Sequence, residues 1–295
     1  MDGELQQVFD RCVAQGVTFF DTGDSYGTGK LKGQSEKLLG QFSQAYAGEN
    51  RDQICLATKL APYPWRLTKG SIVQAGKASI DRMGRVDIAQ LHWSTANYAP
   101  WLEGALLDGL AALVEQGLVK GIGLSNFGPK RLKLAQKRLQ SHGIPIRSLQ
   151  VQYSLLSTYP VTELGLKDLC DELGIQMIAY SPLCLGLLTG KYEVKGPFPK
   201  GLRSFLFPQL LPGMQGLLNC LKDIGSHRNK TIAQVALNWC IGKGTMPIPG
   251  AKTLSQVEQN LGALGWTLDP GEMDALDRSA ASVDRKMIQN IFQSR

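Results

Sequence analysis

Four residues of types that handle protons follow short apolar runs in the first third of the chain. They are Asp21, Tyr26, Lys59 and His92. Each run has the length and composition of a buried parallel strand. In a barrel of parallel strands, the carboxyl ends of the strands form one face, and polar residues there are usually functional. We therefore expect a carboxylate, a phenol, an ammonium and an imidazole to meet at one face.

These four groups suit the delivery of a proton to a reacting oxygen. Hydride addition to a carbonyl leaves an alkoxide, and a phenol can protonate it when a nearby ammonium favours the phenolate. We predict that Tyr26 is this general acid and that Lys59, held by Asp21, is the ammonium. We predict that His92 hydrogen-bonds the carbonyl oxygen and orients it.

Each residue alone also has an ordinary structural explanation. Asp21 could cap a loop, Lys59 could extend from a strand end, Tyr26 could be a rim aromatic, and His92 could be a buried imidazole with satisfied hydrogen bonds. The catalytic interpretation is preferred because successive strands bring all four to the same face.

The rest of the chain supplies the elements that would position these residues. Strand-like runs alternate with amphipathic helices from end to end, at 17–20, 54–58, 86–91, 120–124, 148–152, 176–180 and 245–248. This alternation predicts a parallel sheet with helical crossovers. A (β/α)8 barrel has eight strands, and the chain opens on a helix-like segment at 4–15, so we expect one barrel domain, residues 1–295, that lacks its first strand. We expect residues 186–211 to form a long irregular excursion near the site.

Composition excludes several classes of protein. The net charge is +7, but the densest basic stretch, 130–138, has apolar residues at helical spacing, so we expect a solvated helix face and no nucleic-acid partner. No apolar run is long enough to span a membrane, and the N-terminus does not resemble a signal peptide. The cysteines and histidines lack metal-ligand spacing, so we predict no metal. No feature fixes an oligomeric state.

A phosphate site is predicted after the last strand. Ser255 and Glu258 have the spacing of a capping box at the start of a short helix, where barrels often bind a phosphate, and Lys252 adds a positive charge. This favours NADPH over NADH, although a plain helix cap with a solvated lysine would look the same. Gly27 and Gly29 lack the spacing of a dinucleotide-binding fingerprint, and we interpret them as turn glycines.

Polar and aromatic residues at the ends of the later strands suit a nicotinamide ring. Ser125, Asn126 and Gln150 could hold a carboxamide, and Tyr180 could stack on a planar ring. Each could instead be a rim hydrogen bond or a packed aromatic, but as a set they predict a nicotinamide slot.

Six motifs occur in an order and spacing that resemble the aldo-keto reductase family. They lie at 20–27, 57–60, 90–93, 123–127, 179–183 and 248–251. The resemblance runs from about residue 4 to the C-terminus and implies the reductase barrel and its catalytic tetrad at the four residues above. It implies nicotinamide and phosphate contacts at Ser125, Asn126, Gln150, Tyr180, Ser181, Leu183, Gly250, Lys252, Gln256, Gln259 and Asn260. Gly23 stands where the family usually has Ala, and we expect this change to be harmless.

Within the family, the chain is most similar to plant chloroplast members that reduce pyridoxal to pyridoxine with NADPH. The resemblance implies a small carbonyl substrate, with Trp65 and Trp93 in the substrate pocket, unless these rings are outer packing. It also implies a chloroplast location, although no transit peptide pattern is visible in this chain, and a cytoplasmic one otherwise. The alternative hypothesis is a nucleotide-binding regulatory protein or an inactive isoform, because the first strand is missing.

Overall fold

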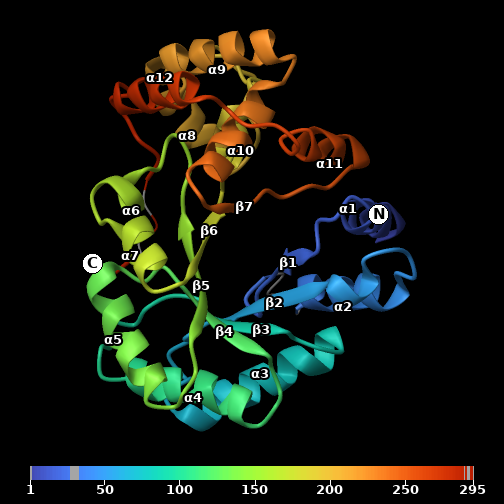
Figure 1. The fold of residues 1–295 in the computed structure, drawn as a ribbon, viewed down its shortest axis with the longest axis vertical. Coiled ribbons are helices and arrows are strands. Elements are labelled where there is room, and N and C mark those ends of the chain that lie inside the picture. Colours follow the sequence, from blue (N-terminus) through green and yellow to red (C-terminus); the bar gives the residue numbers. More distant parts are fainter. Residues whose placement is uncertain (1, 27–32, 289, 291–292, 295) are drawn as a thin grey trace. The chain divides into compact units, whose positions relative to one another are not determined.

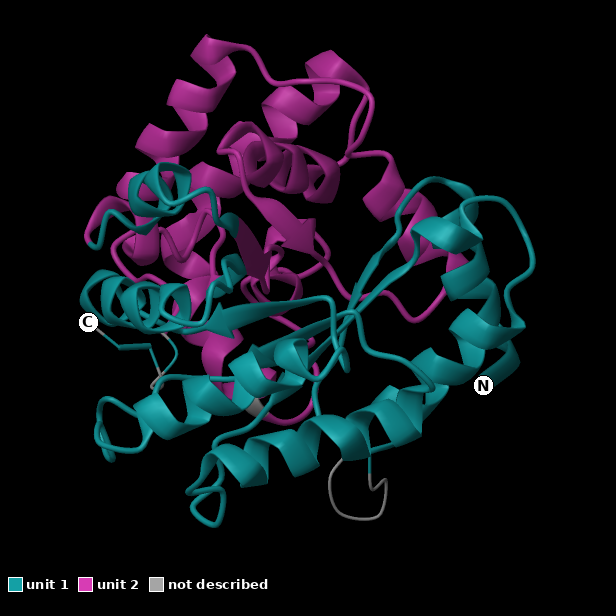
Figure 2. Cartoon of the chain, turned by 60° about the horizontal axis from the view of Figure 1, so that its bottom comes forward, with its two compact units in different colours: residues 1–151, 164–176, 290–295 teal, residues 152–163, 177–289 magenta. Residues whose placement is uncertain are grey.

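The computed structural model describes residues 2–26, 33–288, 290 and 293–294. Gly27 and Gly29, predicted to be turn glycines, lie outside the described residues. The chain divides into two compact units (Figure 2). Unit 1 comprises 1–151, 164–176 and 290–295, and unit 2 comprises 152–163 and 177–289.

Unit 1 is built on parallel strands whose order in the sheet follows the chain. The strands are β1 (Phe19–Asp21), β2 (Cys55–Leu60), β3 (Ile88–Leu91), β4 (Gly121–Ser125) and β5 (Ile146–Gln152). Its helices are α1 (Asp2–Ala14), α2 (Gln34–Ala45), α3 (Lys69–Met83), α4 (Glu103–Glu115), α5 (Pro129–Gln140) and α7 (Leu166–Glu172), with a 3-10 turn η2 (Arg51–Gln53). Helices α3, α4 and α5 pack side by side along the sheet (Figure 1).

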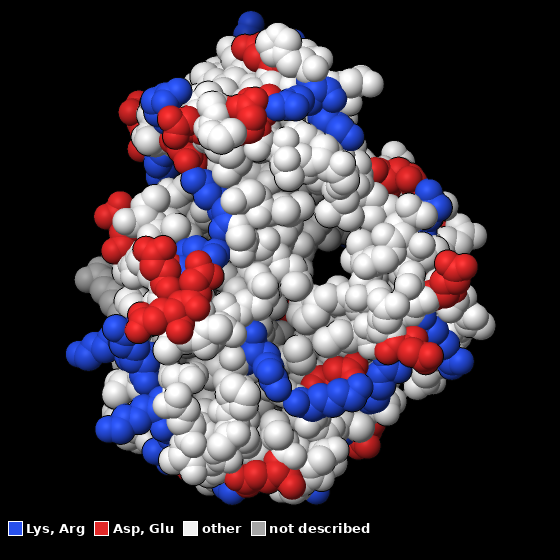
Figure 3. All heavy atoms as spheres, viewed as in Figure 1, with Lys and Arg blue, Asp and Glu red and all other residues white. Residues whose placement is uncertain are grey.

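The pattern of buried residues explains why these segments form strands and helices. All five residues of β4 are buried, as expected for a parallel strand covered on both faces. Helix α5 buries Leu132, Ala135 and Leu139, the spacing of one helix face. Its basic residues point away from this face, as predicted, and Arg138 forms two hydrogen bonds with Asp108 of α4. Basic and acidic side chains are interspersed over the face drawn in Figure 3.

Unit 2 contains two parallel strands and a group of helices. The strands are β6 (Gln176–Tyr180) and β7 (Met246–Ile248), paired from Ile178 with Met246 to Tyr180 with Ile248. The helices are α6 (Tyr159–Thr162), α8 (Leu202–Leu210), α9 (Gln215–Arg228), α10 (Ile232–Gly242), α11 (Leu254–Leu261) and α12 (Pro270–Ala281), with 3-10 turns η3 (Cys184–Thr189) and η4 (Pro212–Met214). Helices α9, α10 and α12 pack together, and the buried Trp239 of α10 stacks on Tyr153 at 5.2 Å between ring centroids.

The seven predicted strands are confirmed, with ends that shift by a few residues. Lys59 lies inside β2 rather than after it. The prediction of an irregular segment at 186–211 was wrong in part, because α8 forms there. Leu206 and Leu210, four residues apart, are both buried, and this apolar spacing stabilises a helix despite Pro208.

Two kinds of feature are absent from the residues that the structure describes. In residues 2–26, 33–288, 290 and 293–294, no helix is both long and apolar enough to cross a bilayer. In the same ranges, no three His, Cys, Asp or Glu side chains are grouped so that they could hold a metal ion.

Candidate active site

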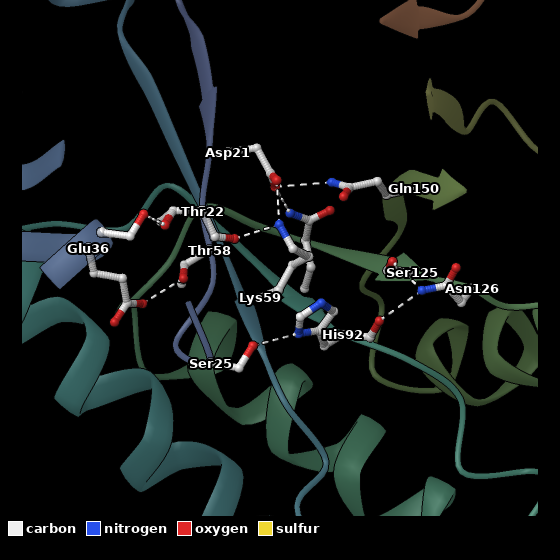
Figure 4. Close-up of polar contacts among 12 residues, drawn as sticks. Asp21, Thr22, Ser25, Glu36, Thr58, Lys59, His92, Ser125, Asn126 and Gln150 are labelled. Carbon is white, nitrogen blue, oxygen red and sulfur yellow. Dashed lines mark hydrogen bonds and ion pairs between the residues drawn. The ribbon is translucent and has the colours of Figure 1, made fainter. Parts of the chain in front are cut away.

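Asp21, the last residue of β1, is the centre of a buried polar network in unit 1 (Figure 4). Its Oδ2 accepts a charged hydrogen bond from Lys59 Nζ. Its Oδ1 accepts from Gln90 Nε2 at 2.7 Å and from Gln150 Nε2 at 3.0 Å. The side chains of Asp21 and Lys59 are 6% and 1% exposed. A buried ion pair needs such additional hydrogen bonds to offset its desolvation, so the network holds the pair in one geometry.

Lys59 adjoins Tyr26 through the face of the phenol ring. Lys59 Nζ also donates to the carbonyl oxygen of Thr22 at 2.6 Å, and it lies 4.8 Å from the centroid of the Tyr26 ring. Among the described residues, no hydrogen bond joins this amine to the Tyr26 hydroxyl, and Tyr26 is 41% exposed. The contact between hydroxyl and amine that an acid role needs therefore stays a prediction.

His92 follows β3 and faces the same group of residues. Its Nδ1 lies 3.2 Å from Ser25 Oγ, and its ring meets Tyr26 edge-on at 5.6 Å between centroids. Burial, and then the charge of Lys59, lower the pKa of His92 from 6.5 to about 3. The imidazole is therefore neutral near pH 7 and has one N–H to donate.

A row of residues crosses the sheet beside the network. In the strand register, Lys59 of β2 pairs with Gln90 of β3, Gln90 with Gly123 of β4, and Gly123 with Ser148 of β5. A Cβ on Gly123 would come within 2.4 Å of Ser148 Oγ. A side chain at position 123 would therefore collide with Ser148 and crowd Gln90, whose Cγ would lie 3.0 Å from that Cβ. Sequence analysis missed Gln90, although an amide inside an otherwise apolar strand was a signal.

Ser125 ends β4 and Asn126 begins the loop after it, and the segment around Ser294 holds this loop. Asn126 has a left-handed backbone with φ of 59°, and its Nδ2 donates to Ser125 Oγ at 3.1 Å and to His92 O at 3.3 Å. Ser294, 1% exposed, donates its backbone N–H to Asn126 O at 3.0 Å. Its Oγ accepts from Gly128 N at 2.9 Å. No sequence motif predicted this contact.

Two buried carboxylates, one beside Tyr26 and one in α2, link the chain after β1 to its neighbours in unit 1. Asp24 accepts from Ala61 N at 3.1 Å and from Arg66 Nη1. Burial raises the pKa of Asp24, and the Arg66 charge opposes that rise. Glu36 accepts from Thr58 Oγ1 at 2.6 Å. These contacts tie the segment after β1 to β2 and to the loop that follows β2.

The two tryptophans predicted for the substrate pocket have different surroundings. Trp93 is half-buried, tilts against His92 at 4.9 Å between centroids, and donates from Nε1 to Tyr98 Oη at 2.9 Å. Trp65 is 71% exposed and stacks on Tyr63 at 4.6 Å. Trp93 thus contacts a tetrad residue, and Trp65 offers an open ring face.

In unit 2, three more predicted cofactor residues lie at the end of β6 and in the loop after it, which borders a cavity. Tyr180, Ser181 and Leu183 are half-buried, and Ser181 has a left-handed backbone with φ of 52°. The cavity has a volume of about 350 Å³ and is lined by Gln152, Ser181, Cys184, Leu185, Leu206, Met287 and Ile288. Ser181 and Gln152 supply its polar side chains, and the other lining side chains are apolar or weakly polar.

Helix α11 of unit 2 carries the predicted phosphate residues, but it begins two residues earlier than predicted. The cap is Thr253, whose Oγ1 accepts from Gln256 N at 3.3 Å. The predicted Ser255–Glu258 capping box was wrong, because Ser255 already lies inside the helix, where its backbone is helical. The Gln256 side chain accepts from Lys252 N at 2.7 Å.

The remaining predicted residues of this segment are open to solvent. Gly250, Lys252 and Gln259 are exposed, and Asn260 is half-buried. The free N–H groups and the lysine of this helix start suit an anion. In unit 1, the structure thus brings Asp21, Lys59 and Gln150 together and links Ser125 and Asn126 to His92 through hydrogen bonds of the Asn126 amide. In unit 2, the remaining predicted residues lie on two segments, one at the end of β6 and one at α11.

The chain belongs to the aldo-keto reductase family, which it matches over residues 2–281. It is similar to a thermostable aldo-keto reductase crystallised with the inhibitor epalrestat, with a TM-score of 0.74 and 26% identity over 94% of this chain and 88% of the other. The fold class is thus the reductase barrel, with seven parallel strands in the described residues.

Two relatives are enzymes with stated substrates. A chloroplastic pyridoxal reductase of Arabidopsis thaliana is 52% identical over the whole chain and 81% of its own length. An L-glyceraldehyde 3-phosphate reductase of Escherichia coli K12 is 28% identical over 97% of this chain and 85% of its own length. The chain is therefore an oxidoreductase of a family that acts on small carbonyl compounds.

Proposed function

We propose that this protein reduces pyridoxal to pyridoxine with NADPH, as one domain of residues 1–295 in the chloroplast. The observation that carries the proposal is the buried Lys59–Asp21 pair beside Tyr26 and His92. The 52% identity to a chloroplastic pyridoxal reductase supports the substrate and the compartment.

Within each unit, the proposed cofactor residues carry donor and acceptor groups that suit one part of NADPH. The hydroxyl of Ser125, the amide of Asn126 and the carbonyl oxygen of Gln150 are donors and acceptors that match a carboxamide. Tyr180, Ser181 and Leu183 would hold the ring and the neighbouring phosphates. Gly250, Lys252, Gln256, Gln259 and Asn260 would hold the adenosine phosphate. When bound, NADPH supplies a hydride for the carbonyl carbon.

The chain's own residues would orient the carbonyl and protonate its oxygen. Neutral His92 donates a hydrogen bond to the oxygen and fixes the direction of the carbonyl. Tyr26 gives its hydroxyl proton to the same oxygen as the carbon–oxygen bond becomes single. Lys59, held in place by Asp21, stabilises the phenolate that remains. Catalytic hydrogen bonds are often long in the free enzyme and shorten with substrate, so the ring-face contact of Lys59 is compatible with this role.

The test is NADPH oxidation with pyridoxal by the wild-type protein and by Tyr26→Phe, with Tyr159→Phe as the matched control. We expect Tyr26→Phe to lower kcat by at least about 100-fold, the usual size of a general-acid contribution. NADPH binding, followed by protein fluorescence, should be unchanged. Turnover of Tyr26→Phe at the wild-type rate would refute the acid role. Binding of NADPH without turnover by the wild-type protein would support a regulatory or inactive isoform instead.

A further inference from the structure

Gln90 is a buried amide in the otherwise apolar strand β3. It lies between Ala89 and Leu91, its side chain is inaccessible to solvent, and its Nε2 donates to Asp21 Oδ1 at 2.7 Å. No step of the proposed reaction uses it. Burying an amide costs free energy unless a hydrogen bond replaces the lost water, so the reason for a glutamine here lies in the contact that it makes.

The direction of this hydrogen bond is fixed by the chemistry of its acceptor. A carboxylate only accepts hydrogen bonds, and the carboxylate of Asp21 is paired with the Lys59 ammonium (Figure 4). Gln90 therefore faces Asp21 with its amino group, because the reversed amide would bring two acceptors within 2.7 Å. The Gln90 carbonyl oxygen is buried and has no hydrogen-bond partner among the described residues. The contact with Asp21 is thus the one that compensates for burial of this amide.

The two oxygens of Asp21 have separate partners. Oδ2 accepts from Lys59. Oδ1 accepts from Gln90 at 2.7 Å and from Gln150 at 3.0 Å. A carboxylate turns easily about its last bond unless its oxygens are held. Gln150 is itself proposed to bind the cofactor, whereas the side chain of Gln90 serves Asp21 alone in the part of the chain that the structure describes.

The sheet leaves room for Gln90 beside Asp21. In the strand register, Gln90 pairs with Lys59 of β2 on one side and with Gly123 of β4 on the other. A Cβ at Gly123 would lie 3.0 Å from Gln90 Cγ and 3.3 Å from Gln90 Oε1, both closer than ordinary contact. A neighbour without a side chain thus admits the amide at the place where it meets Asp21.

We propose that Gln90 is a positioning residue that holds the Asp21 carboxylate with Oδ2 toward Lys59, and so fixes the ammonium beside the Tyr26 ring. Its effect on rate rests on the proposed function, in which Lys59 stabilises the phenolate of Tyr26. Its effect on geometry does not, and is measured in the protein without substrate.

Crystal structures of the wild-type protein and of Gln90→Met, without cofactor or substrate, test the effect on geometry. Methionine has a similar length and no donor. We expect the Asp21 carboxylate to turn in Gln90→Met and Lys59 Nζ to leave its place over the Tyr26 ring. In Gln140→Met, an exposed control at the end of α5, both groups should stay as in the wild type. Unchanged positions of both groups in Gln90→Met would overturn the proposal.

A second variant, Gln90→Glu, makes the donor at this position depend on pH. A protonated carboxyl group donates an O–H to Asp21 as the amide does, whereas an ionised one repels Asp21. The other charged or titratable groups beside Asp21 are Lys59, Tyr26 and His92. His92, with a pKa of about 3, stays neutral from about pH 5.5 to about pH 8.5.

The kinetic readout is kcat with NADPH and pyridoxal, divided by the wild-type value at the same pH. For Gln90→Glu, this ratio should fall at least about tenfold from the lower to the upper end of that range. For Gln90→Met, it should be about three- to tenfold below one, without this slope. Gln140→Glu is the control and should stay near one. Binding of NADPH, followed by protein fluorescence, should be unchanged, and urea denaturation at each pH checks that every variant is folded.

Two kinetic results would refute the positioning role. One is a ratio near one for Gln90→Met, and the other is a ratio for Gln90→Glu that is low at every pH, as expected from damage to packing alone. If Gln90→Met does not fold, the pH comparison with Gln90→Glu decides. If the wild-type protein reduces no carbonyl, the proposed function fails, and the crystal structures still decide the role of Gln90.

Discussion

The residues proposed to do chemistry and those proposed to hold the phosphate are fixed in different ways. In unit 1, the Asp21 carboxylate accepts from Lys59, Gln90 and Gln150, and the ion pair is nearly inaccessible to solvent. In unit 2, Lys252 and Gln259 are exposed near the start of α11. The first group is arranged before any ligand binds, whereas the second can adapt to its ligand. We therefore expect substitutions in unit 1 to affect folding and rate together, and those in α11 to affect cofactor binding alone.

The largest effect is expected for Lys59→Met, which tests whether the unit 1 network serves both stability and rate. The change leaves Asp21 as a buried charge without its cation, so the free energy of unfolding should fall by about 3–5 kcal/mol. The rate of pyridoxal reduction should fall by at least about 100-fold. Urea denaturation and NADPH oxidation measure the two effects. Lys77→Met, an exposed lysine on α3, is the control, and a Lys59→Met protein as stable as this control would break the comparison.

A pH dependence of stability should arise from His92. Its pKa is about 3 in the folded chain and 6.5 when unperturbed, so between these values only the unfolded chain binds the proton. Stability is therefore lost as the pH falls through this window, by up to about 1.4 kcal/mol per pH unit from this residue. Urea denaturation near pH 6.5 and near pH 4.5 measures how much the free energy of unfolding falls between these two values. This fall should be smaller in His92→Gln than in the wild-type protein. An equal fall in the two proteins would mean that His92 is not held neutral.

Lys252→Ala probes the exposed group in unit 2. Removal of one charge-assisted contact to a 2′-phosphate should raise KM for NADPH about five- to tenfold and leave kcat unchanged. KM for NADH, which lacks that phosphate, and the midpoint of urea denaturation should not change. Lys222→Ala, on the exposed part of α9, is the control. A fall in stability of Lys252→Ala would show that this region, too, is held by its own contacts.

The smallest effect is expected for Gly23→Ala, which adds one methyl group beside the network. A Cβ at Gly23 would lie 3.5 Å from the Tyr26 ring and 3.6 Å from the Lys59 side chain, both ordinary contact distances. The loss of freedom in the unfolded chain should raise the free energy of unfolding by about 0.4–1 kcal/mol. Activity should be unchanged. A lower midpoint in thermal unfolding would show that unit 1 has no room at this position.

Sequence reasoning located the strands, and the residues proposed as the tetrad near their ends, because both depend on local pattern. Short apolar runs give the strands, and Asp21, Lys59 and His92 lie at or near the end of their runs. The start of α11 was misplaced because Thr253 and Ser255 are both good helix caps, and only the backbone shows which one is used.

The contacts that hold the site were beyond the sequence because they join distant segments. Gln90 and Gln150 reach Asp21 from strands 69 and 129 residues away, and no spacing rule covers such distances. The position of the Lys59 amine over the ring of Tyr26, rather than at its hydroxyl, depends on side-chain rotation. Contacts between distant segments and side-chain rotations of this kind follow only from a three-dimensional structure.

The clamp of Ser294 on the loop after β4 sets an order of events during synthesis. Its Oγ accepts from Gly128 N, 166 residues earlier in the chain, so this contact cannot form until residue 294 has left the ribosome. The loop with Asn126 must then wait, long after its own strand is made, for this distant segment to arrive. Nascent chains that stop before residue 294 should therefore carry this loop without its clamp, however well the neighbouring strands have folded.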